Sequence, residues 1–177
     1  MTHFPEGNPV LDPGPFTLCA AGDRAPKPRP QGTLPGLGDR MRTAAFAEWQ
    51  AIAAFGWAAE KFTDAPEQLR SDWLAQVKDE ARHYNLIRQR MTELGLSLAE
   101  RPVSQALWDS LITCDTGKQF CIRIVSAEER GRQAAETLVK FLGDKDPATA
   151  AVFAEIAQDE VAHVSLAKIY FDWSPTP

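Results

Sequence analysis

The pattern Asp-Glu-x-x-His occurs twice in this sequence, at residues 79–83 and again at residues 159–163. Side chains three positions apart lie on one face of a helix, so the glutamate and the histidine of each copy can bind the same metal ion. One such pair is a weak signal, because a surface ion pair looks the same, but two matched copies predict a metal site. The candidate ligands of the two copies are Glu80, His83, Glu160 and His163.

A further glutamate precedes each copy by the same interval. The spacing from Glu48 to Glu80 equals the spacing from Glu128 to Glu160. A helical bundle that binds two metal ions needs one Glu from each of two helices and Glu-x-x-His from each of the other two. Glu129 competes with Glu128, because one step along a helix turns the side chain by only about 100°, but the equal spacing favours Glu128. The sequence thus predicts four carboxylate and two imidazole ligands. The four carboxylates carry enough negative charge to balance two divalent ions.

An aspartate stands immediately before each motif glutamate. Metal-bound histidines usually donate their second N–H to a carboxylate that fixes the ring. The offset of each aspartate from its own glutamate aims it towards the neighbouring motif-bearing helix. We therefore predict a crossed arrangement, in which Asp79 contacts His163 and Asp159 contacts His83. The alternative is that both aspartates are solvated acids on the helix surface.

The donor set of oxygen and nitrogen, without thiolate, suits iron or manganese. We expect two iron ions, with manganese or a mixed manganese and iron pair left open. Trp49 and Tyr84 follow candidate ligands directly; they fit an electron-transfer role, but packing is the commoner use of aromatic side chains at helical spacing. Other residues expected in the core or at a cavity are Phe46, Ile52, Phe55, Val125 and Ile156.

Four stretches with apolar residues at helical spacing carry these ligands. The turns at Asp64 and Asp144 are separated by the same number of residues as the two motifs. The sequence therefore predicts two equivalent antiparallel helical hairpins. A crossover over about 96–117, which contains a short helix, joins them. The expected fold class is all-α, a four-helix bundle. The predicted helices cover about 40–62, 67–94, 118–142 and 148–171.

The segment 1–38 differs from the rest of the chain, because it holds eight of the thirteen prolines. This composition favours extended or polyproline geometry and cannot form a core by itself. We therefore divide the chain into an extended arm, 1–38, and a bundle domain, 39–173. The arm is expected to lie on the surface of the bundle.

The composition of the chain disfavours some classes of binding partner. A net charge of −5 and a pI of about 5.2 disfavour binding to nucleic acid or to an anionic membrane. The N-terminus has no basic region followed by an apolar run, and no apolar stretch approaches the length of a membrane helix, which predicts no signal peptide and no membrane span. Cys19, Cys114 and Cys121 follow no zinc or redox spacing, so we expect reduced thiols and a cytoplasmic location.

The order Glu, Glu-x-x-His, Glu, Glu-x-x-His over residues 40 to about 171 resembles the ferritin-like di-iron carboxylate superfamily. Five segments look like a bacterial ferritin-like family of uncharacterised function, and the tRNA-modifying di-iron hydroxylases are more distantly similar. Members often carry a histidine before the first glutamate, where this chain has Phe46, which puts any shared substrate in doubt. The five segments are residues 24–30, 48–52, 79–83, 128–131 and 159–163.

The resemblance implies a di-iron centre that activates dioxygen to oxidise or hydroxylate a small organic substrate, with electrons from a donor protein. In that reading Glu80 and Glu160 bridge the ions, and the substrate enters between helices. The alternative is an iron-binding or storage protein with ferroxidase chemistry, no organic substrate and a closed multi-subunit shell. A third alternative is a structural bundle in which the metal serves only to stabilise the fold. The oligomeric state stays open, a homodimer included.

Overall fold

The computed structural model describes residues 9–175, and within that range it contains five α-helices and no strand. Residues 1–8, the beginning of the predicted arm, lie outside the described range, as do 176–177. The helices are α1 (Leu34–Lys61), α2 (Glu67–Glu93), α3 (Ala106–Leu111), α4 (Gly117–Leu142) and α5 (Pro147–Phe171). The predicted all-helical bundle is therefore confirmed, with α3 as the short helix of the crossover.

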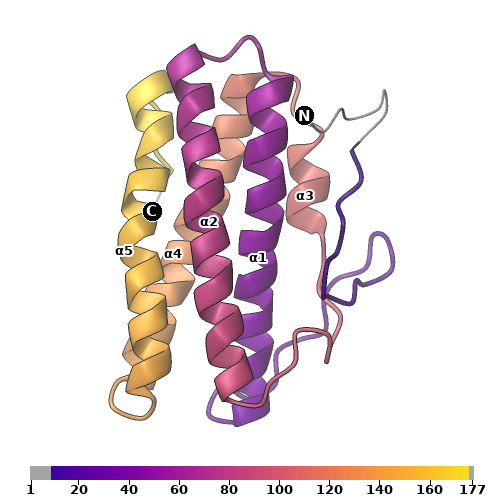
Figure 1. The fold of residues 1–177 in the computed structure, drawn as a ribbon, viewed down its shortest axis with the longest axis vertical. Coiled ribbons are helices and arrows are strands. Elements are labelled where there is room, and N and C mark those ends of the chain that lie inside the picture. The colour runs from indigo at the N-terminus through magenta and orange to yellow at the C-terminus, as the bar shows by residue number, and fades with distance from the viewer. Residues whose placement is uncertain (1–8, 176–177) are drawn as a thin grey trace.

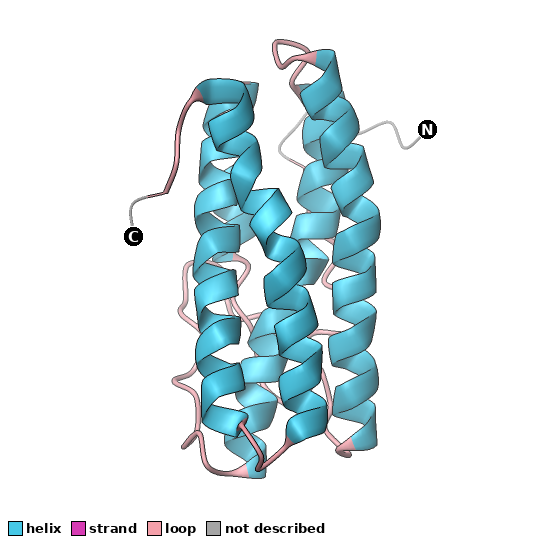
Figure 2. Ribbon diagram, turned by 90° about the vertical axis from the view of Figure 1, so that its left-hand side faces the viewer, coloured by secondary structure: helices cyan, strands magenta, loops and turns pink. Residues whose placement is uncertain are grey.

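The four long helices run side by side and form two antiparallel hairpins (Figures 1 and 2). Helix α1 packs mainly on α2, and α4 packs mainly on α5. The crossover returns the chain along the length of the bundle, so that α1 and α4 run in opposite directions where they meet, as do α2 and α5 (Figure 1). None of the described helices is long and apolar enough to cross a lipid bilayer.

Side-chain caps set where several helices begin. The hydroxyl of Thr33 accepts a hydrogen bond from Gly36 N, and Pro35 lies in the first turn of α1, where its missing N–H costs nothing. Helix α1 consequently begins at Leu34, within the segment predicted as arm, although the Pro-Gly-Leu-Gly sequence reads as a helix breaker. Thr116 and Asp146 cap α4 and α5 in the same way.

An aromatic cluster fills the bundle near the α1–α2 turn. Phe120 of α4 contacts Trp73 of α2 at 5.1 Å between ring centroids, Phe62 at 5.6 Å, and Phe55 of α1 at 6.2 Å. All four side chains are no more than 2% exposed, so this region is packed as a hydrophobic core. Of the residues predicted for the core, Ile52 is partly buried and the following are fully buried: Phe46, Phe55, Val125 and Ile156.

The arm does more than lie on the surface. Leu11 and Phe16 are 5% and 6% exposed and belong to the core, with the Phe16 ring centroid 4.8 Å from that of Phe46. Leu18 forms an isolated bridge with Val103 of the crossover. The expected tail on the bundle surface is therefore anchored by two of its large apolar side chains, whose burial is favourable.

A buried carboxylate fastens the arm to the bundle. Asp39 of α1 accepts hydrogen bonds from the backbone N–H of Arg29 at 2.8 Å and from its Nε at 2.9 Å. The same carboxylate pairs with Arg101 at 2.6 Å and with Arg42 at 3.0 Å. Burial of the carboxyl opposes ionisation, but Arg29 and Arg101 outweigh it and hold the pKa of Asp39 well below its usual range. The boundary between arm and bundle domain at residue 38 stays a prediction.

Candidate metal centre

Six acidic and histidine side chains meet in the centre of the bundle. Asp64 lies midway in sequence between Glu48 and Glu80, so the antiparallel hairpin brings the two glutamates to the same level. Asp144 has the same relation to Glu128 and Glu160. Each of the six side chains belongs to a residue no more than 9% exposed. They are Glu48 of α1, Glu80 and His83 of α2, Glu128 of α4, and Glu160 and His163 of α5.

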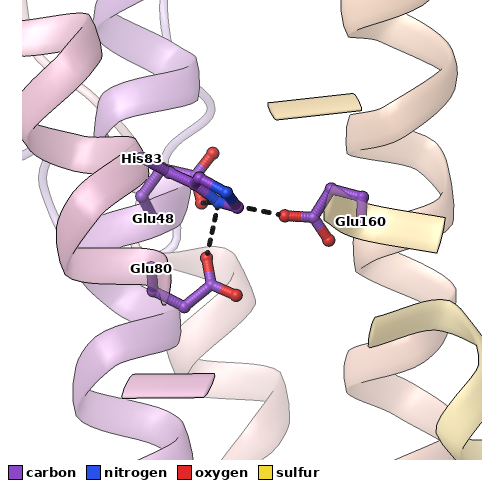
Figure 3. A group of neighbouring side chains, drawn as sticks. All are labelled: Glu48, Glu80, His83 and Glu160. Atoms are coloured by element: carbon purple, nitrogen blue, oxygen red, sulfur yellow. Dashed lines mark ion pairs between the residues drawn. The ribbon is translucent and has the colours of Figure 1, made fainter. Parts of the chain in front are cut away.

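Four of these side chains form the tightest group. One donor atom from each of Glu48, Glu80, His83 and Glu160 lies within 4.8 Å of the others, and Figure 3 shows Glu160 reaching across from its helix towards His83. Glu128 lies outside this group but is buried beside Glu160 and lines the same cavity as Glu48 and Glu160. Its competitor Glu129 is instead paired with Arg132 at 2.8 Å.

Two glutamates each face both histidines. Glu80 places one oxygen 3.7 Å from His83 Nδ1 and the other 3.0 Å from His163 Nδ1. Glu160 likewise places one oxygen 3.3 Å from His83 Nδ1 and the other 3.3 Å from His163 Nδ1. Each carboxylate thus directs a different oxygen at each imidazole, and the four contacts are related by an approximate two-fold symmetry.

The outer nitrogens of the two histidines face the two motif aspartates. His83 Nε2 lies 3.3 Å from Asp159, and His163 Nε2 lies 3.5 Å from Asp79. These contacts have the crossed arrangement expected from the sequence. With Nε2 directed at an aspartate, each imidazole presents Nδ1 to the interior cluster.

Arg82 supports one of these aspartates, and sequence reasoning missed it. Its guanidinium hydrogen-bonds to Asp159 and pairs with Glu155 at 2.6 Å. The equivalent position of the second motif holds Ala162, and the structure shows no corresponding arginine contact to Asp79 within the described residues. The position of Arg82 inside the first motif was a signal, but the motif alone does not show which carboxylate on α5 it reaches.

Burial and crowding shift the acid–base properties of the cluster. Burial, reinforced by nearby carboxylates, raises the pKa of Glu48 and of Glu128 well above the usual value. Burial also opposes ionisation of Glu80, but His163 and His83 outweigh it and lower its pKa to about 2. For the histidines burial favours the neutral ring, yet the glutamates raise the pKa to about 12 for His83 and about 10 for His163. The glutamates and histidines of the cluster therefore shift one another's pKa values in opposite directions.

Several buried donor atoms at this point have no hydrogen-bond partner among the described residues. Their contacts with one another at 3.0–3.7 Å lack hydrogen-bond geometry. Unsatisfied buried polar groups are costly and rare in folded proteins, and here all of them can donate an electron pair to a cation. The donor set therefore fits divalent metal ions. The atoms are both carboxylate oxygens of Glu80, Oε2 of Glu160, and Nδ1 of His83 and of His163.

A cavity of about 600 Å³ adjoins the cluster. It lies between α1 and α4, with Phe153 and Ile156 of α5 in its wall, and it reaches Glu48, Glu128 and Glu160 at the cluster. Its volume falls within the range of small-molecule sites. A molecule in this cavity would lie beside three of the candidate ligands.

Comparison with known protein families places the chain in a group without an assigned activity. A family model described as "Protein of unknown function (DUF455)" matches residues 11–176. The chain belongs to this family. The match to the DUF455 model spans most of the arm, both hairpins and all six candidate ligands. Neither the curated proteins nor the solved structures contain a significant match to the chain.

Proposed function

We propose that this DUF455 protein is a ferritin-like dinuclear metal protein whose two iron ions activate dioxygen to oxidise or hydroxylate a small organic substrate. The observation that carries the proposal is the placement of Glu80 and Glu160, each with one oxygen towards His83 and the other towards His163. A single ion needs no such duplication. Carboxylates that serve two neighbouring ions need both oxygens directed in this way.

In this proposal the chain supplies all six protein ligands. Glu80 and Glu160 would hold both ions, His83 and His163 would bind through Nδ1, and the two remaining glutamates, Glu48 and Glu128, would complete the donor set. Two ferrous ions held there would supply electrons for the reduction of dioxygen. Manganese, or a mixed pair, is compatible with the same donors.

The other residues of the site orient and enclose these ligands. Asp159 and Asp79 accept the Nε2–H of His83 and His163 and keep Nδ1 free for metal. The buried walls around Glu80, which is 0% exposed, exclude bulk water, which strengthens the interaction of each carboxylate with a cation. Electrons for repeated turnover come from an external donor protein.

The cavity beside Glu48, Glu128 and Glu160 favours an organic substrate over iron storage. A storage protein needs a closed shell of subunits and no binding site for an organic molecule next to its ligands. Size-exclusion chromatography separates the two functions: a monomer or dimer supports the oxygenase proposal, and a large closed shell supports storage.

Metal analysis of protein expressed with ample iron and manganese tests the centre itself. We expect about two ions per chain, a higher melting temperature with metal than without it, and oxygen consumption by the reduced protein. Glu128→Ala should lower the metal content, while the matched Glu129→Ala keeps it. Protein that takes up no metal contradicts the proposal, and metal-loaded protein that consumes no oxygen with any reductant contradicts its enzymatic part.

A further inference from the structure

The cavity between α1 and α4 exists because small side chains face each other across it. Ala44 and Ala47 of α1 line one side, and Gly131 and Ala135 of α4 line the other. Gly131 is exposed at the cavity, and a Cβ added there would meet no atom within 4 Å. The cavity of about 600 Å³ is large enough for a small organic molecule.

The inner wall of the cavity is apolar. Phe153 and Ile156 of α5 and Leu138 of α4 line it, and each is no more than 5% exposed. Apolar surface of this kind gains most from an apolar ligand, which releases water from the wall. The polar exceptions at the inner end are Glu48, Glu128 and Glu160, whose negative charge is neutralised when metal binds.

Two arginines in the cavity lining carry charge that no carboxylate of the described residues balances. Arg40 donates from one terminal nitrogen to the backbone oxygens of Arg29 at 3.1 Å and Gly36 at 2.8 Å, which leaves its other nitrogens available. The side chain of Arg130 has no ion pair or hydrogen bond within residues 9–175, and it is exposed on α4. By contrast, the neighbouring Arg132 is paired with Glu129 and Glu136.

The arm helps to place one of these charges. Pro28 and Gln31 line the same cavity, and Arg29 between them is fastened to Asp39. The backbone oxygen of Arg29 in turn holds Arg40. In a chain with a net charge of −5, a cavity with two unbalanced arginines and an apolar wall is a specific feature, because the average surface repels anions.

We infer that this cavity binds an organic anion with an apolar body, with the acid group at Arg40 and Arg130 and the body against Ile156 and Phe153. The orientation follows from the lining, since Arg40 and Arg130 carry the cationic groups without a carboxylate partner among the described residues and the inner wall is apolar. As the substrate class of the oxidation, the inference rests on the proposed function. As a binding site, it stands on the lining residues alone.

Calorimetric titration of the metal-loaded full chain tests the inference with three probes of equal chain length: decanoate, decanol and decylammonium. Decanoate should bind, and the other two should bind about tenfold more weakly or worse, because only the carboxylate forms charge-assisted hydrogen bonds to arginine. Decanol that binds as tightly as decanoate overturns the assignment of an anion. The absence of decanoate binding overturns the site.

Matched variants locate the binding. Gly131→Leu should fill the cavity and abolish decanoate binding, while Gly56→Leu, at a helical glycine with equally open space but outside the cavity, should leave it unchanged. Arg130→Gln should weaken binding about tenfold; Arg88→Gln, an exposed arginine of α2 whose only side-chain partner among the described residues is Asn85, should not. Equal effects in test and control variants overturn the inference.

Metal content measured on the same samples separates this inference from the proposed function. Normal metal content without decanoate binding refutes the anion site and leaves the dinuclear centre standing. Decanoate binding that depends on Gly131 and Arg130, in protein that takes up no metal, supports the site and refutes the oxidation.

Discussion

Glu48 and Glu128 divide the interface between helices α1 and α4 into two sides along the bundle axis. The two sides are packed differently. On one side Phe55 and Phe120 meet edge to face, with ring centroids 6.2 Å apart and an interplanar angle of 81°, and Trp73 packs on Phe120. On the other side Ala135 and Arg40 border the cavity. One side of the interface is therefore filled and the other is hollow.

The repeat that aligns the two hairpins makes this comparison residue by residue. At the offset between the two motifs, Phe55 corresponds to Ala135, and Phe120 corresponds to Arg40. Two aromatic rings on the filled side are thus matched on the hollow side by a methyl group and a cation. The ligands at the same offset are unchanged. The repeat keeps the candidate metal ligands constant, while their surroundings divide into a packed part and a part that borders the cavity.

The largest expected effect is on the filled side. Phe120→Ala removes a fully buried ring from the aromatic cluster and should lower the free energy of unfolding by about 3–5 kcal/mol. Leu138→Ala on the hollow side should cost about 2 kcal/mol or less, since part of that side chain faces the cavity. Urea denaturation measures both. Equal losses would show that the hollow side is packed as firmly as the other.

The two halves also differ in how their aspartates are held, because Arg82 contacts Asp159 and no equivalent arginine contact to Asp79 is present within the described residues. Asp159→Ala should weaken metal binding about 10–100-fold, and Asp79→Ala, whose side chain is half exposed, should weaken it less. Competition titration with cobalt(II) measures both affinities. A larger loss for Asp79→Ala would contradict the role given to Arg82.

The ionic anchor of the arm belongs to the hollow side only, and its contribution should depend on pH. The pKa of Asp39 is lowered in the folded chain, so its stabilisation is present above the unfolded pKa of about 3.9 and is lost as the pH falls below that value. Asp39→Asn should lower stability at neutral pH and flatten the decline in acid.

Urea denaturation at several pH values checks the Asp39 prediction. Glu93→Gln serves as the control, since the pKa of Glu93 is also lowered by its hydrogen bond with Arg90 but the pair lies on the surface, where it should contribute little. An unchanged pH profile in Asp39→Asn would show that the arm is held by Leu11 and Phe16 instead. Decanoate titration of the same variant reports whether the anchor also positions Arg40.

The smallest effect on stability is expected when an aromatic residue of the filled side is introduced at the equivalent position of the hollow side. Ala135→Phe introduces the ring found at the equivalent Phe55, and because the cavity can accept it, stability should change by less than about 1 kcal/mol. Decanoate binding should be lost. Ala54→Phe on the filled side, at a position that is 0% exposed, should instead cost about 1–3 kcal/mol, as thermal denaturation would show.

The sequence by itself determined the helices, the two hairpins and the level of the ligands. Helical periodicity assigns Glu80 and His83 to one face, and the equal intervals around Asp64 and Asp144 bring both pairs of glutamates to one height. These relations hold within one helix or one hairpin, so the spacing of residues along the sequence predicts them. The donor set added the expectation of iron and the resemblance that of dioxygen activation, and both stay proposals.

Only the tertiary structure decided which surfaces meet. Helix α1 begins at Leu34 because of a cap at Thr33, and the arm buries Phe16 against α1. Glu128 and not Glu129 faces the cluster, and Arg82 reaches a carboxylate on α5. The cavity is also decided by the tertiary structure, because alanines and glycine at helical spacing predict closely packed helices as readily as a cavity between them. Contacts between distant elements depend on how far apart the helix axes lie, which the packing of all the other side chains sets.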